Sequence, residues 1–129
     1  MKTTREGLSY YQQLVDDLVE RSEGVLANWV VGSGWPDTED NRAINNFLKT
    51  LSREQKKILA DMVMQARRGG MHDVLACLSE KMDMDEFRLS EKGVPLPLDP
   101  YGGGFHYAFI SRLEGDAWPE DADLEATDA

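Results

Sequence analysis

The chain has 129 residues, 41 % of them hydrophobic, and a formal net charge of −10, which excludes a chain disordered throughout and fits one ordinary domain. One cysteine and two histidines exclude an internal disulfide and a Cys/His zinc site. No apolar run approaches the roughly 20 residues that cross a bilayer, and the N-terminus lacks the apolar segment of a secretory signal, so we expect a cytoplasmic protein without membrane contact.

The first predicted element is a long helix over residues 4–31, where apolar side chains recur with the three- and four-residue spacing of one helical face. Gly24 interrupts this pattern at a cost of about 1 kcal/mol relative to alanine, and it predicts either a kink or a break into two helices. The run GSGWP over residues 32–36 ends the segment, because glycine terminates helices and proline cannot continue one.

A short second helix is predicted to end near Leu48, with Asp37 or Thr38 as its N-cap. Ser52 is followed three residues later by Gln55, the spacing of a capping box, in which each side chain bonds the backbone N–H of the other residue. This pair predicts the start of a third helix.

Gly69 and Gly70 are predicted to end the third helix after Arg68 and to separate it from a fourth, which begins at Met71 or His72 and ends at Met82. Each of these two helices carries an apolar stripe that we expect to face the core. The stripes are Ile58, Leu59, Met62, Val63 and Ala66 on the third helix, and Met71, Val74, Leu75, Leu78 and Met82 on the fourth.

The pattern changes after residue 85. Alternation over 87–90, a turn at 91–93 and a proline-containing segment over 94–98 predict a small β-hairpin. Apolar residues between 105 and 113 then predict a last helix, closed by Gly115. The expected fold class is therefore mainly α, a compact bundle of four to five helices with a small β-hairpin before the last helix.

Charge separates the end of the chain from its body. Seven of the 24 acidic residues and no basic residue lie in the last 16 positions. We expect residues 1–119 to form a single helical domain and residues 120–129 to form an acidic, disordered tail, because the tail has too few apolar side chains to offset its ordering entropy. The alternatives for the tail are mimicry of nucleic acid and docking on a basic face. Direct nucleic-acid binding by the whole molecule is disfavoured, because phosphate contacts need local positive charge.

Catalytic motifs are incomplete in this sequence. It has no GxxxxGK[ST] phosphate-binding loop. A nucleophile elbow around Ser33 would need glycine two positions before and after it, where Val31 and Trp35 stand. An enzyme remains the alternative interpretation, a small hydrolase or ligand-binding enzyme using His72, Asp73 and His106, with Ser33 as a further candidate. That interpretation requires the two imidazoles to lie within about 10 Å of each other, since catalytic groups act at hydrogen-bond distance or through one water. We predict no cofactor and no metal.

Two surface features favour binding over catalysis. Residues 49–68 contain six basic and two acidic residues, which indicates either an ordinary solvated face or a site for an anionic partner with salt-sensitive affinity. Trp29 and Trp35 flank a glycine-rich segment and are candidates for interface anchors, with packing inside the core as the alternative. Further aromatic candidates elsewhere in the chain are Tyr101, Tyr107 and Trp118. The basic residues of the candidate face are Arg53, Lys56, Lys57, Arg67 and Arg68.

Four runs of sequence are distinctive: VVGSGWP at 30–36, GGMHDVL at 69–75, LSEKGVPLP at 89–97 and RLEGDAWP at 112–119. Together they resemble a family of short bacterial proteins known only as a domain of unknown function, over roughly residues 5–119. The resemblance implies a free-standing bacterial protein and transfers no catalytic residue. The predicted function is a non-enzymatic cytoplasmic interaction or regulatory domain that binds an unidentified protein or associates with itself.

Overall fold

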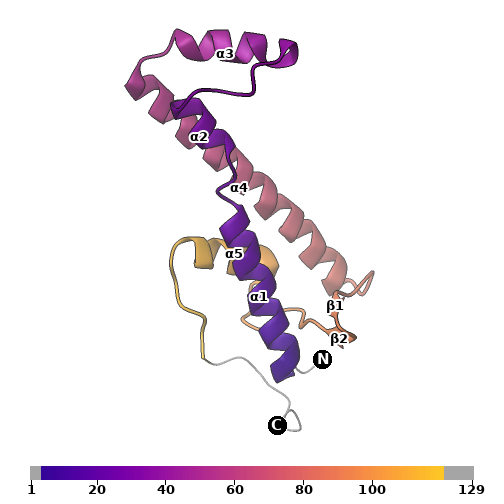
Figure 1. Ribbon diagram of the computed structural model, residues 1–129. Helices are drawn as coiled ribbons and strands as arrows, with labels where there is room; N and C mark the ends of the chain where they lie inside the picture. The colour runs from indigo at the N-terminus through magenta and orange to yellow at the C-terminus, as the bar shows by residue number, and fades with distance from the viewer. Residues whose placement is uncertain (1–3, 121–129) are drawn as a thin grey trace. The chain divides into compact units, whose positions relative to one another are not determined.

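The computed structural model describes residues 4–120, which form five α-helices, one 3-10 helix and a two-stranded hairpin before the last helix (Figure 1). The predicted fold class is therefore confirmed. Backbone contacts divide the chain into two compact units. We call residues 22–70 the middle unit, and residues up to 21 together with those from 71 onward the terminal unit. The single domain over 1–119 stays a prediction, and the predicted tail lies, apart from Glu120, outside the described residues.

The terminal unit is built on α1 (Arg5–Arg21), which lies beside α5 (Gly104–Leu113) in Figure 1. The C-terminal part of α4 (Arg53–Asp83) and the segment after the hairpin add the remaining core side chains. Aromatic rings dominate this core, because each ring buries a large apolar area. The buried cluster consists of Tyr11, Val15, Leu75, Met82, Leu96, Phe105, Ala108 and Phe109.

The hairpin consists of β1 (Ser90–Glu91) and β2 (Val94–Pro95), paired antiparallel with Ser90 opposite Pro95. Lys92 and Gly93 form the turn, and their φ angles of 51° and 79° are both left-handed. Two such residues make the type of two-residue turn that follows the natural twist of paired strands. The turn is therefore one residue shorter than predicted, because Glu91 belongs to the strand.

In the middle unit the chain runs through α2 (Leu26–Val31), a 3-10 helix (Glu39–Asn41), α3 (Arg42–Lys49) and the first part of α4. The long helix predicted over residues 4–31 is thus two helices, the second of the two alternatives. Gly24 lies in the break with a φ of 57°, and a Cβ there would lie 2.6 Å from Nε of Arg67. Both the backbone conformation and the contact therefore require glycine at this position.

A side-chain amide holds the loop between α2 and α3 in place. The Trp35 backbone N–H donates to Oδ1 of Asn45 at 2.9 Å, and Nδ2 of Asn45 donates to the Trp35 carbonyl at 3.1 Å. Gly34 approaches the same amide with a φ of 90°, and a Cβ there would lie 2.5 Å from Asn45 Oδ1. Asn45 therefore replaces the backbone pairing that an irregular loop lacks.

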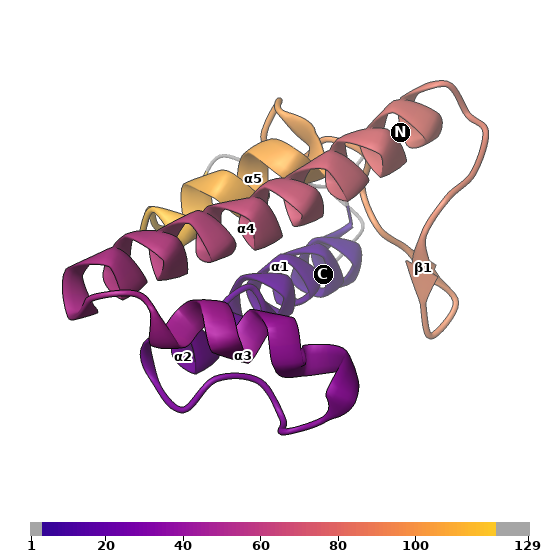
Figure 2. The ribbon, with the colours of Figure 1, turned by 90° about the horizontal axis from the view of Figure 1, so that it is seen from above.

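The third and fourth predicted helices are one continuous helix, α4, which Figure 2 shows unbroken. Its predicted start is confirmed, because Ser52 and Gln55 bond each other's backbone N–H groups at 2.8 and 3.1 Å. The predicted stop at Gly69 and Gly70 is wrong, since neither glycine adopts a positive φ. Each glycine lowers the stability of the helix by about 1 kcal/mol relative to alanine. A break would leave up to four N–H groups and four C=O groups without helical partners on its two sides, so the continuous helix is favoured.

The apolar stripes predicted for α4 are only partly buried. Leu75 and Met82 are buried, but Ile58, Met62 and Val74 expose 62, 59 and 60 % of their surface. A helical wheel places apolar residues on one face but does not show whether another element covers that face.

Candidate functional site

The basic residues predicted to form one face of α4 have two different roles. Nε of Arg67 donates to the Ser22 carbonyl at 3.1 Å, and Nε of Arg68 lies 3.3 Å from the Ser22 hydroxyl. Ser22 is buried and directly follows α1, where carbonyl groups lack helical partners and attract cations. These two arginines therefore stabilise the fold at Ser22.

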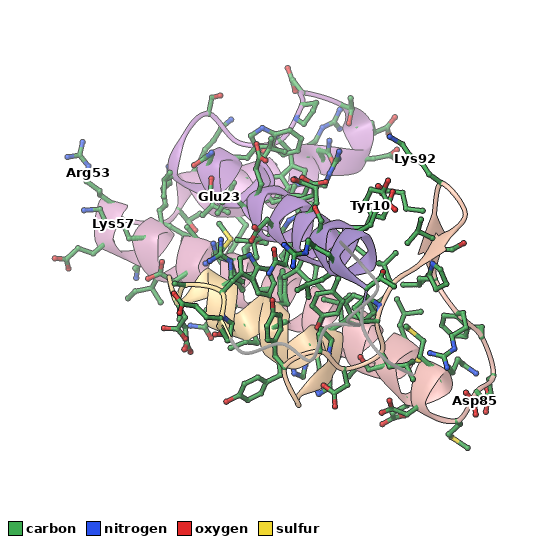
Figure 3. The ribbon with its side chains drawn as sticks, turned by 90° about the horizontal axis from the view of Figure 1, so that it is seen from below. Tyr10, Glu23, Arg53, Lys57, Asp85 and Lys92 are labelled. Carbon is green, nitrogen blue, oxygen red and sulfur yellow. The ribbon has the colours of Figure 1, made fainter. Side chains whose placement is uncertain are left out.

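The other three basic residues are open to solvent or half-buried. Arg53, Lys56 and Lys57 line a hollow of about 520 Å³ together with Val31 of α2. Figure 3 shows Arg53 and Lys57 extending outward from the first turns of α4. Within residues 4–120, none of these three cations forms an ion pair. We call this site the basic hollow, and its unpaired positive charge is available to an anionic group.

Large apolar side chains are exposed on the same unit. Val31, which lines the basic hollow, is 49 % exposed, and Ile58 follows Lys57 on α4. On α3, Ile44 and Phe47 are 39 and 55 % exposed, and their spacing of three residues places them side by side. Of nine large hydrophobic side chains exposed in the described chain, six lie in the middle unit. These six are Val25, Val31, Ile44, Phe47, Ile58 and Met62.

The two tryptophans predicted as interface anchors contact each other. The rings of Trp29 and Trp35 meet edge to face, with centroids 5.5 Å apart, and both residues are half-buried. The bonds from Asn45 hold the backbone of Trp35 and so fix this pair beside α3. The pair therefore supports the loop and also presents part of its surface to solvent.

The two histidines that the alternative, enzymatic interpretation requires to be close together lie next to each other in the terminal unit. The rings of His72 on α4 and His106 on α5 lie 5.3 Å apart, nearly perpendicular. Asp73 Oδ1 lies 3.2 Å from Nδ1 of His72, and Nδ1 of His106 is buried without a hydrogen-bond partner among the described residues. Among residues 4–120, no group of three His, Cys, Asp or Glu side chains could hold a metal ion. Ser33, the further candidate of the enzymatic interpretation, belongs to the middle unit, whereas both histidines belong to the terminal unit.

A pocket that the sequence did not predict lies between α5 and the segments on either side of it. Tyr101, Tyr107 and Trp118 form its aromatic walls, and its volume is about 80 Å³. The rings of Tyr101 and Trp118 stack with centroids 5.4 Å apart. We call this site the aromatic pocket.

Asp16 on α1 fixes one wall of the aromatic pocket. It accepts hydrogen bonds from Nε and Nη2 of Arg112 at 2.8 and 3.3 Å and from Nε1 of Trp118 at 3.1 Å. The guanidinium of Arg112 also lies 4.9 Å from the Trp118 ring. About 100 residues separate Asp16 from these partners, so no local sequence pattern could have revealed the contact.

Tyr11 is a buried residue that contacts two of the aromatic walls of the pocket. Its ring stacks on Phe105 at 4.6 Å and meets the rings of Tyr101 and Trp118 edge to face, each at 6.2 Å. Burial raises the pKa of the Tyr11 hydroxyl well above its usual value of 10. Deprotonation of Tyr11 is therefore shifted to more alkaline pH than for an exposed tyrosine.

Comparisons with known proteins give one finding. The model of a family described as a family of unknown function, DUF6547, matches residues 4–120. No curated protein and no solved structure matches the chain. No helix within residues 4–120 has the length and apolar character needed to span a membrane.

Proposed function

The chain belongs to the family of unknown function DUF6547, and we propose that it is a non-enzymatic protein-interaction domain of the bacterial cytoplasm. The partner protein would bind the middle unit. One observation carries the proposal: six large apolar side chains are exposed there, one of them inside the basic hollow. Large exposed apolar side chains gathered in one unit of a protein mark a candidate interaction surface.

Charge supports the same surface. By sequence the middle unit has seven basic and six acidic residues, whereas the terminal unit has seven basic and eighteen acidic residues. An acidic partner is therefore repelled by the terminal unit and attracted to the basic hollow. Covering a fully exposed Phe, Ile or Met contributes about 1.5–3 kcal/mol each, so covering several half-exposed side chains favours association.

Site-specific photocrosslinking in the expressing cell tests this proposal. A photoreactive amino acid in place of Phe47 or Ile58 should give a crosslinked product of defined mass. Val74 is the matched control, because it is equally exposed but belongs to the terminal unit. Equal crosslinking at all three positions, or none at any, contradicts the proposal.

Charge reversal separates the role of the basic hollow from that of apolar contact. Lys57→Glu should abolish the product formed from position 47, whereas Lys92→Glu, a change of the same charge in the exposed hairpin turn, should leave it unchanged. A product of twice the chain's mass would identify the partner as a second copy. In that case light scattering should show dissociation of the complex on dilution.

The histidine pair favours a second candidate function, a small hydrolase or ligand-binding enzyme using His72, Asp73 and His106. The 5.3 Å between the rings satisfies the distance that this function requires, and the Asp73 carboxylate can orient the His72 ring. It ranks second because Asp73 is itself exposed and the described residues supply neither a metal cluster nor an activated nucleophile beside the pair. Hydrolysis of a simple ester by the purified chain, lost in both His72→Ala and His106→Ala, would reverse this ranking.

A further inference from the structure

We propose that the aromatic pocket of the terminal unit binds a proline-rich segment of a partner protein, with a proline ring between the aromatic walls and a basic residue beside it. The pocket belongs to the other unit of the chain and does not depend on the function proposed for the middle unit. Aromatic-lined grooves recognise proline-rich chains because the polyproline II helix is preformed and loses little entropy on binding.

Contacts within the terminal unit position the walls of the pocket before any ligand binds. Tyr101 and Trp118 stack on each other, and Asp16 fixes Trp118 through its indole N–H. Tyr107 is 68 % exposed, yet a Cβ at Gly103 would lie 2.7 Å from its ring, so the ring rests against the loop backbone. A rigid aromatic surface requires little ordering when a ligand arrives.

The polar side chains of Arg112 and Ser111 in the pocket lining already have partners. Arg112 bonds Asp16 and the Asp116 carbonyl, and the Ser111 hydroxyl donates to the Asp116 carboxylate at 2.8 Å. The pocket therefore presents mostly ring faces and suits an apolar group. The Tyr107 hydroxyl has no bond to the described residues and can donate to a peptide carbonyl, which a polyproline II chain leaves unpaired.

The size of the pocket matches one small ring. Its volume is about 80 Å³, whereas pockets for drug-sized molecules have roughly 300–1,000 Å³. A single proline ring fits this space, and the rest of an extended peptide would cross the surface outside it. A whole cofactor or nucleotide would not fit.

Charge around the pocket selects the residue next to the proline. Asp99 and Asp116 are exposed and are bonded to pocket residues, and Glu114 is exposed one turn after Ser111. This arrangement attracts an arginine or lysine of the peptide and repels an acidic flank. A cation inside the pocket is disfavoured, because the Arg112 guanidinium lies 4.9 Å from the Trp118 ring.

Fluorescence anisotropy with the full chain tests the proposal. The probe is a labelled peptide of six prolines between two arginines, and its matched partners replace the arginines by glutamates or the prolines by alanines. The arginine-flanked proline peptide should bind saturably, and each replacement should weaken binding about tenfold or more. Equal binding of all three peptides would overturn the proposal, as would no binding of the first.

Variants locate the site. Tyr107→Ala should weaken binding about tenfold and Tyr107→Phe by a smaller factor, through loss of the hydroxyl donor. Tyr107 is largely exposed, so neither change should unfold the chain, and Phe47→Ala in the middle unit should leave the affinity unchanged. The indole N–H signal of Trp118 should shift on titration. Binding unaffected by Tyr107→Ala, or tighter binding of free indole than of the peptide, would overturn the assignment.

Discussion

The two units of this chain use apolar side chains differently. In the terminal unit α1, α4 and α5 cover one another's apolar faces, and eight hydrophobic residues are buried in one cluster. In the middle unit, all of which the structure describes, only Val30 and Leu48 among the hydrophobic residues are buried, while six large ones are exposed. Similar helical patterns in sequence thus lead to a core in one unit and to an open surface in the other. The difference teaches that what covers a helical face, and not the face itself, decides whether it serves stability or binding.

The largest expected effect is on stability in the terminal unit. Phe105→Ala removes a fully buried ring that stacks on Tyr11, and we expect it to lower the free energy of unfolding by about 3–5 kcal/mol. Phe47→Ala makes the same chemical change at a residue that is 55 % exposed, and we expect a loss of about 0.5 kcal/mol or less. Urea denaturation followed by circular dichroism measures both. Equal losses would remove the distinction between the two units.

The next effect is in the middle unit, which we expect to depend on polar bonds more than on buried area. Asn45→Ala removes both bonds to the backbone of Trp35 and should cost about 1–3 kcal/mol. Hydrogen exchange at the Trp35 amide should rise correspondingly. Asn46→Ala, a neighbouring exposed asparagine, is the control and should have little effect. Unchanged protection at Trp35 in the Asn45 variant would show that the loop does not need the amide.

The sequence predicted the start of α4 and the hairpin well because local signals specify them. The capping box at Ser52 and the left-handed turn residue Gly93 act within a few positions of themselves. The stop at Gly69 was wrong because a glycine pair ends a helix only where its backbone turns left-handed, and the pattern alone does not show φ.

The candidate sites were less predictable, because each depends on contacts between distant residues. Arg67 looked equivalent to Arg53 by charge and spacing, and its bond to Ser22 crosses 45 positions of the chain. The histidine pair was named as a requirement of one hypothesis, but its 5.3 Å separation followed only from the packing of α5 on α4. The sequence named the aromatic side chains of the pocket as separate candidates but did not show that they form one site, since Asp16 and Trp118 come together only in the folded terminal unit.

A smaller effect depends on pH and should be confined to the terminal unit. The folded pKa of Tyr11 is raised above its unfolded value of 10, so the unfolded state loses the proton first as pH rises. The stabilisation that protonated Tyr11 gives the folded state is fully present below pH 10. Above pH 10 the free energy of unfolding falls by at most about 1.4 kcal/mol per pH unit because of this group. Urea titrations at pH 9 and 11 should show the loss in the parent chain, and Tyr11→Phe should reduce it. An equal loss in the variant would assign the alkaline effect to other groups.

The smallest predicted effect concerns α4, the one helix that contributes residues to both units. Gly69→Ala and Gly70→Ala should each raise stability by about 0.5–1 kcal/mol, because neither has a positive φ and nothing lies within 4 Å of an added Cβ. Gly24→Ala is the contrasting variant and should lower stability, since its φ is 57° and Arg67 occupies the space. Thermal melts of the three variants measure these differences. One outcome would link these glycines to binding: alanine at 69 or 70 stabilises the isolated chain but weakens the crosslinking expected at Phe47. The glycines would then serve partner binding, because a helix without side chains at these positions lets another chain approach α4 closely.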